Sequence, residues 1–255
     1  MSFLGRLFGK KDTVEEVDDG SPKMDRSLVR MQKKLMNKYH QTMERKRIIY
    51  ILKDIGSDDA IRVLLGRFTY VTDGSIVDED EKTLTYEIIR SFGDRALPAL
   101  EGFIRDEVSI YWALRAYTEI AGDDAAVELI LSCLDAIHDR FDRSMEKMSN
   151  LVSSLRDYQH PDVLGRLIEL SKDESEEIRF LASDGLTMYA EHREAVDAML
   201  ERLIDEEETT RLKTYIVDQA IENRWNVKRF KKTLSERIPE GYFVDDTGII
   251  QRRSF

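Results

Sequence analysis

The chain of 255 residues lacks the features that mark disulfide-rich, exported or membrane-spanning proteins. Its single cysteine, Cys133, excludes an intramolecular disulfide and indicates a reducing compartment. The longest apolar runs, such as Ile48–Leu52, fall far short of the roughly 20 residues that span a bilayer. Residues 2–8 are interrupted by Arg6, so we expect no export signal there. These observations favour a cytoplasmic protein, which could also lie at the inner face of a membrane.

Residues that carry chemistry are also scarce. The four histidines are His40, His138, His160 and His192, and no two of them have the spacing of a helical metal site. The sequence contains no glycine-rich phosphate loop and no nucleophile elbow. We therefore predict no catalytic residue, no metal and no cofactor.

Proline and glycine, which interrupt helices, are rare as well. The chain has 4 prolines and 13 glycines, while 42% of its residues are hydrophobic and 35% are charged. This composition is typical of a helical protein with a substantial core, and it is too apolar for a disordered chain.

What the sequence does contain is an internal repeat. The segments Gly56-Ser57-Asp58, Gly93-Asp94 and Gly122-Asp123 share a pattern in which glycine ends one helix and aspartate caps the next. Three later segments punctuate the chain more weakly: Tyr158–Asp162, Glu191–Arg193 and Asn223–Asn226.

An apolar stripe at helical spacing follows each of these six segments. The stripes begin at Ile61, Leu97, Val127, Val163, Val196 and Val227, so that successive steps are 36, 30, 36, 33 and 31 residues. One helix pair cannot bury its apolar faces alone, but a row of pairs shares a continuous core. The sequence therefore predicts an all-α solenoid of about six helix pairs.

Two units resemble the HEAT-repeat family at the level of residues. The segment Glu177–Ala182 is similar to the Val-Arg-x-x-Ala signature of that family, and Gly93–Leu100 matches it again. The resemblance covers residues 42–238 and is nearest to the short, bilin-lyase-like type of HEAT repeat. The His-Glu pairs of HEAT-type di-iron hydroxylases are missing from this sequence.

The repeats divide the chain into four expected parts. Residues 1–22 form an amphipathic tip and an acidic disordered linker, and residues 23–41 form a basic N-terminal capping helix. The repeat solenoid occupies residues 42–238, and residues 239–255 form a tail with a small β-hairpin around Asp245–Gly248.

Charge is distributed unevenly along these parts. The net charge of the chain is −11, whereas residues 1–47 carry +5 and residues 224–255 carry +4. The body between them, residues 48–223, therefore carries −20. Such a body repels nucleic acid and attracts basic protein segments.

These observations together predict a non-catalytic interaction scaffold or adaptor, not an enzyme, that binds a protein partner through a basic segment. The HEAT resemblance implies binding on a concave face lined by the second helix of each pair. The expected binding residues are Arg62, Arg105, Glu128, Asp135, Arg166, Glu169, Asp197 and Glu201. The alternatives are a HEAT-like DNA glycosylase for alkylated bases and a bilin-lyase-like enzyme; a glycosylase would need a basic, aromatic-lined face.

The N-terminal tip offers a second interaction site. Its apolar and basic side chains suit weak peripheral contact with a membrane or docking into a partner, although a frayed terminus is the simpler interpretation. The residues concerned are Phe3, Leu4, Arg6, Leu7, Phe8, Lys10 and Lys11. The basic helix that follows is interpreted mainly as a cap, and its alternatives are binding of acidic lipid or phosphate, docking along the acidic solenoid, and a short dimer seam.

Three further features have structural interpretations. The cluster Asp78–Glu81 is expected to be a capping box before a helix that begins near Lys82, not a cation site. Cys133 is expected to pack as a small apolar residue. Of the aromatic residues, Tyr111, Trp112, Tyr117 and Trp225 are divided between core positions and candidate interface anchors.

Overall fold

A computed structural model describes residues 24–253, which form two compact units. Unit 1 comprises residues 1–150 and unit 2 comprises residues 151–255. The predicted amphipathic tip and acidic linker, residues 1–22, lie outside the described residues.

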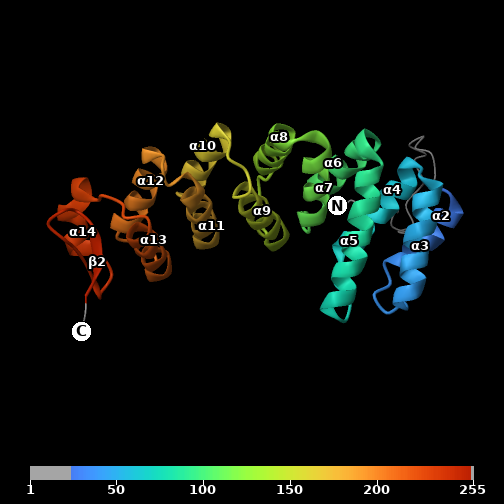
Figure 1. Cartoon of the computed structure of the whole chain (residues 1–255), viewed down its shortest axis with the longest axis horizontal. Helices are drawn as coiled ribbons and strands as arrows, with labels where there is room; N and C mark the ends of the chain where they lie inside the picture. The colour runs from blue at the N-terminus through green and yellow to red at the C-terminus, as the bar shows by residue number, and fades with distance from the viewer. Residues whose placement is uncertain (1–23, 254–255) are drawn as a thin grey trace. The chain divides into compact units, whose positions relative to one another are not determined.

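Unit 1 consists of antiparallel helix pairs that follow one another along the chain (Figure 1). Its first helix, α2 (Arg26–Leu35), packs against the first pair. The elements after it are α3 (Thr42–Ile55), α4 (Asp58–Leu65), η1 (Gly66–Thr69), α5 (Ser75–Ser91), η2 (Gly93–Ala96), α6 (Leu97–Asp106), α7 (Tyr111–Ala121), α8 (Asp123–Asp135) and most of α9 (Asp142–Leu155).

Unit 2 continues with the end of α9 and repeats the arrangement. Its elements are α10 (Pro161–Leu170), α11 (Glu176–Leu186), η3 (Thr187–Tyr189), α12 (Arg193–Ile204), α13 (Thr210–Glu222), η4 (Lys228–Phe230), α14 (Lys231–Arg237), β1 (Tyr242–Val244) and β2 (Ile250–Arg252). The predicted all-α fold of about six helix pairs with a small C-terminal hairpin is confirmed.

The first five predicted stripes fall on the second helix of a pair, whereas the last begins at Val227, before η4 and α14. In the first pair Ile61, Leu64, Leu65 and Phe68 are fully buried, and in the stripe that begins at Val163 all members but Ile168 are buried. Because each helix is amphipathic, it gains stability by turning this face toward its neighbours rather than toward water.

The turns between helices use the predicted glycines, but the caps differ in detail. Gly56 has a left-handed φ of +56° at the end of α3. The side chain of Ser57, and not that of Asp58, accepts the hydrogen bond from the N–H of Ala60. Asp58 is instead the first helical residue, where its negative charge interacts favourably with the positive end of the helix dipole.

The start of α5 corrects the predicted capping box. The helix begins at Ser75 rather than near Lys82, so that Asp78 and Glu81 both lie inside it. The two side chains are buried and paired with Arg67, Arg45 and Lys82. They therefore pair with Arg67 and Arg45 of other elements and with Lys82 of α5 itself, and they do not form the predicted capping box.

The C-terminal hairpin is antiparallel, and Val244 pairs with Ile250. The side chain of Asp245 accepts hydrogen bonds from the N–H groups of Thr247 and Ile249, which fixes the turn between the strands. Gly248, with φ +86°, packs its backbone against Lys228, so the hairpin rests on the turn before α14.

Candidate functional site

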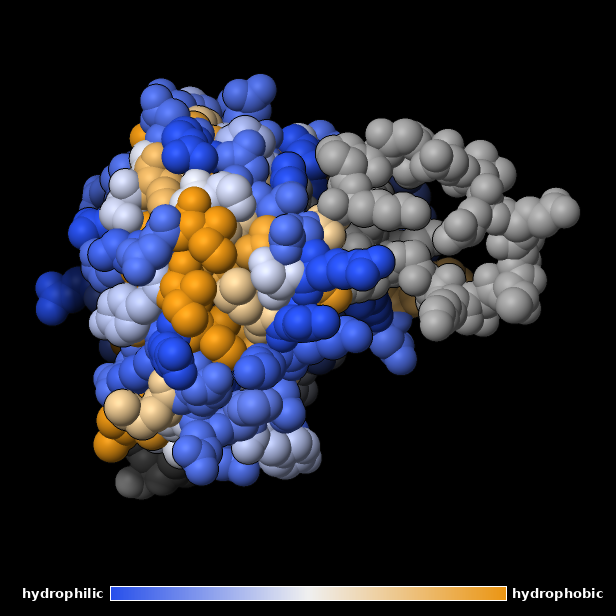
Figure 2. Space-filling view, turned by 90° about the vertical axis from the view of Figure 1, so that its right-hand side faces the viewer, coloured by the Kyte–Doolittle hydropathy of each residue, from blue (hydrophilic) through white to orange (hydrophobic). Residues whose placement is uncertain are grey.

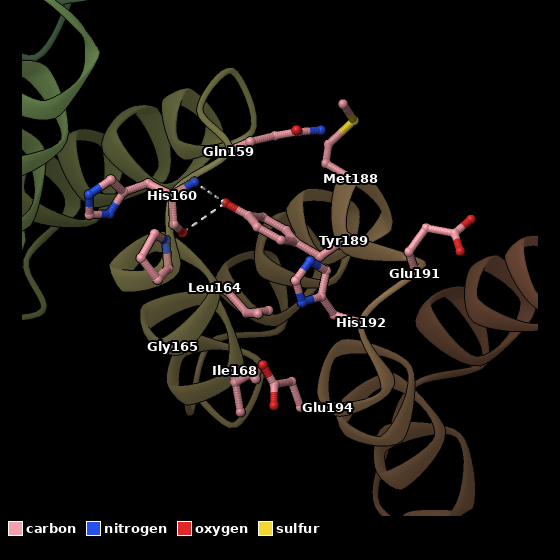
Figure 3. A pocket seen from close by; sticks show the side chains of 11 residues that line it. Gln159, His160, Leu164, Gly165, Ile168, Met188, Tyr189, Glu191, His192 and Glu194 are labelled. Atoms are coloured by element: carbon pink, nitrogen blue, oxygen red, sulfur yellow. Dashed lines mark hydrogen bonds between the residues drawn. The ribbon is translucent and has the colours of Figure 1, made fainter.

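A pocket of about 610 Å³ opens in unit 2 between two successive turns of the repeat (Figure 3). One wall comes from the turn before α10 and from α10 itself, and the other comes from η3 and the start of α12. The side chains that line it are Gln159, His160, Pro161, Leu164, Gly165, Ile168, Met188, Tyr189, Glu191, His192 and Glu194.

Tyr189 holds the two walls in place. Its hydroxyl accepts a hydrogen bond from the N–H of His160 at 2.9 Å and lies 2.8 Å from the carbonyl oxygen of Tyr158, to which it can donate. Burial raises the pKa of Tyr189, so the hydroxyl remains protonated and keeps this role. The two turns are therefore fixed to each other before any ligand enters.

The two histidines of the pocket have different tasks. His160 is the N-cap of α10: its Nδ1 accepts from the N–H of Asp162 at 3.1 Å, and Figure 3 shows its ring directed away from the pocket. His192 is exposed, and its ring meets the edge of Tyr189 with centroids 5.8 Å apart. His192 is thus the imidazole that a ligand in the pocket could reach.

One wall of the pocket is open at Gly165, which is itself exposed. This residue lies within α10, and a Cβ built on it would meet no atom within 4 Å. Leu164 and Ile168 supply apolar surface beside it. A helix interior normally disfavours glycine, so the empty space is a feature that a side chain here would remove.

Two carboxylates make the rim acidic. Glu191 and Glu194 are both exposed. Figure 3 shows the carboxylate of Glu191 extending away from the other labelled groups, whereas Glu194 projects from the start of α12. An organic cation with an apolar body would therefore match both the charge and the lining of this pocket.

The binding residues predicted from the sequence are distributed over both units. Arg62, Arg105, Glu128 and Asp135 belong to unit 1, and Arg166, Glu169, Asp197 and Glu201 belong to unit 2. Each lies on the second helix of a pair. That they form one concave binding face stays a prediction.

Several of these residues are engaged by neighbours in their own unit. Arg62 pairs with Asp59 at 2.7 Å, and Asp197 pairs with Arg229 at 3.1 Å. Glu201 lies 3.3 Å from Lys172. These ion pairs are partly exposed and therefore contribute little to stability.

The remaining predicted positions divide between core and surface. Trp112, Tyr117 and Trp225 are buried, while Tyr111 is 61% exposed. Cys133 is buried. Within residues 24–253, no helix is long and apolar enough to cross a membrane, and no group of three or more His, Cys, Asp or Glu side chains could hold a metal ion.

The positions of two histidines within the repeats are the one sequence feature from which the pocket could have been predicted. His160 and His192 lie in the turns of consecutive repeats, each just before the helix that carries the next apolar stripe, which begins at Val163 or Val196. Equivalent turns of adjacent repeats lie next to each other in a stacked array. The two histidine-containing turns could therefore have been placed together, but not the opening at Gly165.

A scan with protein-family models finds no match for the chain, and a search of curated proteins finds none either. A search of solved structures finds human deoxyhypusine hydroxylase in complex with glycerol. The match has a TM-score of 0.32 and 14% sequence identity, and it covers 83% of this chain and 93% of that one.

This match corrects the functional prediction. A solved helical protein similar to this chain carries the name of an enzyme, so the prediction of a non-catalytic scaffold that is not an enzyme is contradicted and is not maintained. At this TM-score and identity the similarity transfers neither an activity nor a residue role to this chain. The function must be argued from the pocket itself.

Proposed function

We propose that the chain binds a small organic cation in the pocket of unit 2 and exchanges a proton with it through His192. One observation carries the proposal: the exposed backbone of Gly165 leaves room in the pocket beside apolar, aromatic, imidazole and carboxylate groups. A concave, mostly apolar pocket with a few polar groups is the usual form of a small-molecule site.

The roles of the lining residues follow from their positions. Leu164 and Ile168 bury the apolar body of the ligand, and Glu194 attracts its charged end. The ring of Tyr189 offers a face to a cation, while its hydroxyl is committed to the turn. His192 is left as the group that can accept or donate a proton, since imidazole does both near neutral pH.

The binding part is tested by ligand-observed NMR of the full chain with a library of small aromatic and aliphatic amines. Gly165→Leu should abolish binding of every amine that the wild type binds, because the leucine side chain would occupy the open space of the pocket beside position 165. Gly165→Ala, which fills far less volume, should retain most of the affinity. Amines that bind wild type and Gly165→Leu equally would refute the proposed site.

The charge of the rim has a matched control in the same turn. Glu194→Gln should weaken amine binding by about tenfold, because it removes a carboxylate from the pocket side. Glu191→Gln makes the same chemical change at a side chain that points outward, and it should have a smaller effect. If the two variants lose the same amount of amine affinity, Glu194 has no specific role in the pocket and the loss is a general effect of surface charge.

The proton-exchange part is tested in D₂O on an amine that binds. The ammonium N–H protons of the amine should exchange with deuterium of the solvent faster in the presence of the wild type than with His192→Gln, because imidazole can take a proton from the nitrogen and return a deuteron to it. Binding should persist in that variant. Equally fast exchange with His192→Gln would remove His192 from the proposal and leave the binding site intact.

A basic protein segment remains a proposed partner, independently of this chemistry. A second pocket of unit 2, of about 440 Å³, is lined by five acidic side chains and two arginines. The residues are Asp173, Glu174, Arg179, Arg202, Asp205, Glu207 and Glu208. Arg179 is already held by Glu208 at 2.8 Å, so the uncompensated charge of the lining is negative.

We also infer that the repeats are of the short HEAT type and that the protein is cytoplasmic. The signature segment Glu177–Ala182 lies on α11, and Gly93–Leu100 spans η2 and the start of α6, which are the places such a repeat requires. The single cysteine, Cys133, supports the location.

A further inference from the structure

We infer that the end of unit 1 formed by α2 and α3 binds an anionic membrane surface. This end combines exposed apolar side chains with a dense positive charge, and the two features point to one partner. The inference concerns unit 1 alone and does not depend on the proposed pocket of unit 2.

The apolar part lies on the outer face of α3. Met43 is 79% exposed, Tyr50 51%, Ile51 37% and Ile55 43%. Met43, Tyr50 and Ile51 lie on one side of the helix, because residues seven or eight positions apart are two turns above each other, and Ile55 lies one turn beyond Ile51 toward the edge of the buried face. Figure 2 shows apolar side chains gathered in a band at this end of the molecule, bordered by hydrophilic ones.

The opposite face of α3 accounts for its stability and leaves the outer face without a structural task. Ile48, Ile49 and Leu52 are buried, and Arg45 reaches Glu81 inside the unit. Met43 is therefore largely left to solvent by the fold of residues 24–253, and more than a third of Ile51 and of Ile55 is left to solvent as well. A contiguous exposed apolar surface rimmed by polar residues typically marks an interaction site.

The charge around this band has the opposite sign to that of the whole chain. Residues 24–56 contain nine basic and three acidic side chains, and without Arg45, which is buried against Glu81, their net charge is +5, whereas the chain carries −11. Of the basic groups Arg26, Arg30, Lys33 and Arg47 are exposed. Basic residues close to an anionic bilayer are attracted to its negative surface potential.

These two features select a membrane over other polyanions and over a second copy. A nucleic acid would satisfy the charge but offers no apolar phase to Ile51 and Ile55. A second copy that met this face with its own would bring two positive surfaces together. The interface of an anionic bilayer accepts apolar side chains among anionic headgroups, which is what the face requires.

The test is flotation of the full chain with vesicles of phosphatidylcholine containing 30% phosphatidylserine, and with phosphatidylcholine alone. We expect binding to the anionic vesicles at least tenfold stronger than to the neutral ones. The double variant Met43→Ser/Tyr50→Ser should reduce binding about tenfold, and so should Arg47→Glu. A circular-dichroism melt of each variant establishes that it is folded.

Matched controls separate the face from the rest of the surface. Tyr111→Ser removes an aromatic side chain that is 61% exposed in unit 1 but outside α2 and α3. Arg193→Glu makes the same charge change as Arg47→Glu at a side chain 79% exposed in unit 2. Both controls should bind the anionic vesicles as the wild type does.

Deletion of residues 1–22 distinguishes the face from the upstream segment that carries Phe3 and Phe8. The deleted chain should still bind anionic vesicles and remain sensitive to Met43→Ser/Tyr50→Ser. The inference is overturned if the deletion abolishes binding, or if neither vesicle is bound. It is equally overturned if duplex DNA binds more tightly than the vesicles, or if the double variant converts a dimer to a monomer.

Discussion

The carboxylate of Glu81 lies between two guanidinium groups in the interior of unit 1. It accepts from Nε of Arg45 at 3.0 Å and from Nε of Arg67 at 2.8 Å, and all three side chains are buried. Burial of a charge is costly unless a partner of opposite sign compensates it. The main contribution of Glu81 to stability is therefore to compensate the buried charge of the two arginines.

We expect Glu81→Gln to lower the free energy of unfolding of unit 1 by about 3–5 kcal/mol, because it leaves two buried cations without a carboxylate between them. Urea unfolding followed by circular dichroism measures this loss. Glu87→Gln on the same helix is the control: Glu87 is half exposed and pairs with Arg90 at the surface, so its loss should stay within about 0.5 kcal/mol. Equal effects of the two changes would contradict the account.

Asp78 gives the same network a dependence on pH. Burial raises the pKa of Asp78, but hydrogen bonds from Lys82, from Arg67 and from the N–H of Thr72 outweigh it and bring the pKa from 3.8 to about 2. A carboxyl group whose pKa is lower in the folded state than in the unfolded state stabilises the folded protein at pH values above the unfolded-state pKa. This stabilisation is lost as the pH falls through the folded-state pKa. The contribution, on the order of 2 kcal/mol, should disappear between about pH 4 and pH 2.

Urea unfolding of the wild type and of Asp78→Asn between pH 5 and pH 2 tests this sign. The variant should be less stable at pH 5, and the difference between the two proteins should shrink as the pH falls. A difference that stays constant over this range would exclude Asp78 as the titrating group.

At the scale of elements, two glycines of unit 2 allow a matched comparison of helix propensity and packing. Gly165 lies in α10 with open space around its missing Cβ, whereas a Cβ on Gly185 in α11 would approach Leu167 to 3.0 Å. Gly165→Ala should stabilise unit 2 by about 0.5–1 kcal/mol, since alanine favours a helix. Gly185→Ala should give no such gain, because Leu167 must move. Thermal unfolding of both variants measures the two changes in stability. An equal gain in stability for the two variants would contradict the proposed difference in packing.

The sequence predicted the elements where their signals are local. The stripes that begin at Ile61 and Val163 fall on helices as expected, because amphipathic spacing and helix caps act within a few residues. The start of α5 was misjudged because the partners of Glu81 lie 14 and 36 residues away. No local pattern shows that a run of carboxylates will be buried against distant arginines.

The candidate site was predictable only in part for the same reason. His160 and His192 were recognised as punctuation, and their repeat positions place them in adjacent turns. The pocket also depends on the missing side chain of Gly165 and on the hydrogen bonds of Tyr189 to the turn at residue 160. Both arise from the packing of α10 against η3, which the periodicity of the sequence does not describe.

At the scale of the whole molecule, the uneven charge makes binding of basic segments depend on salt. The body of the chain, residues 48–223, carries −20, and unit 2 contains an acidic pocket. A fluorescent oligolysine peptide should therefore bind at low ionic strength and lose affinity steeply between 50 and 300 mM salt, because screening weakens exposed charge pairs. Fluorescence anisotropy measures this, and an affinity independent of salt would refute the electrostatic part of the proposal.

The central claim is that the space above Gly165 is a ligand site, and calorimetric titration tests it most directly. The tightest amine from the library is titrated into wild type, Gly165→Ala and Gly165→Leu, each shown to be folded. The account predicts a saturable one-to-one isotherm for the wild type, a modest loss for alanine and no heat of binding for leucine. Identical isotherms for the three proteins would contradict it.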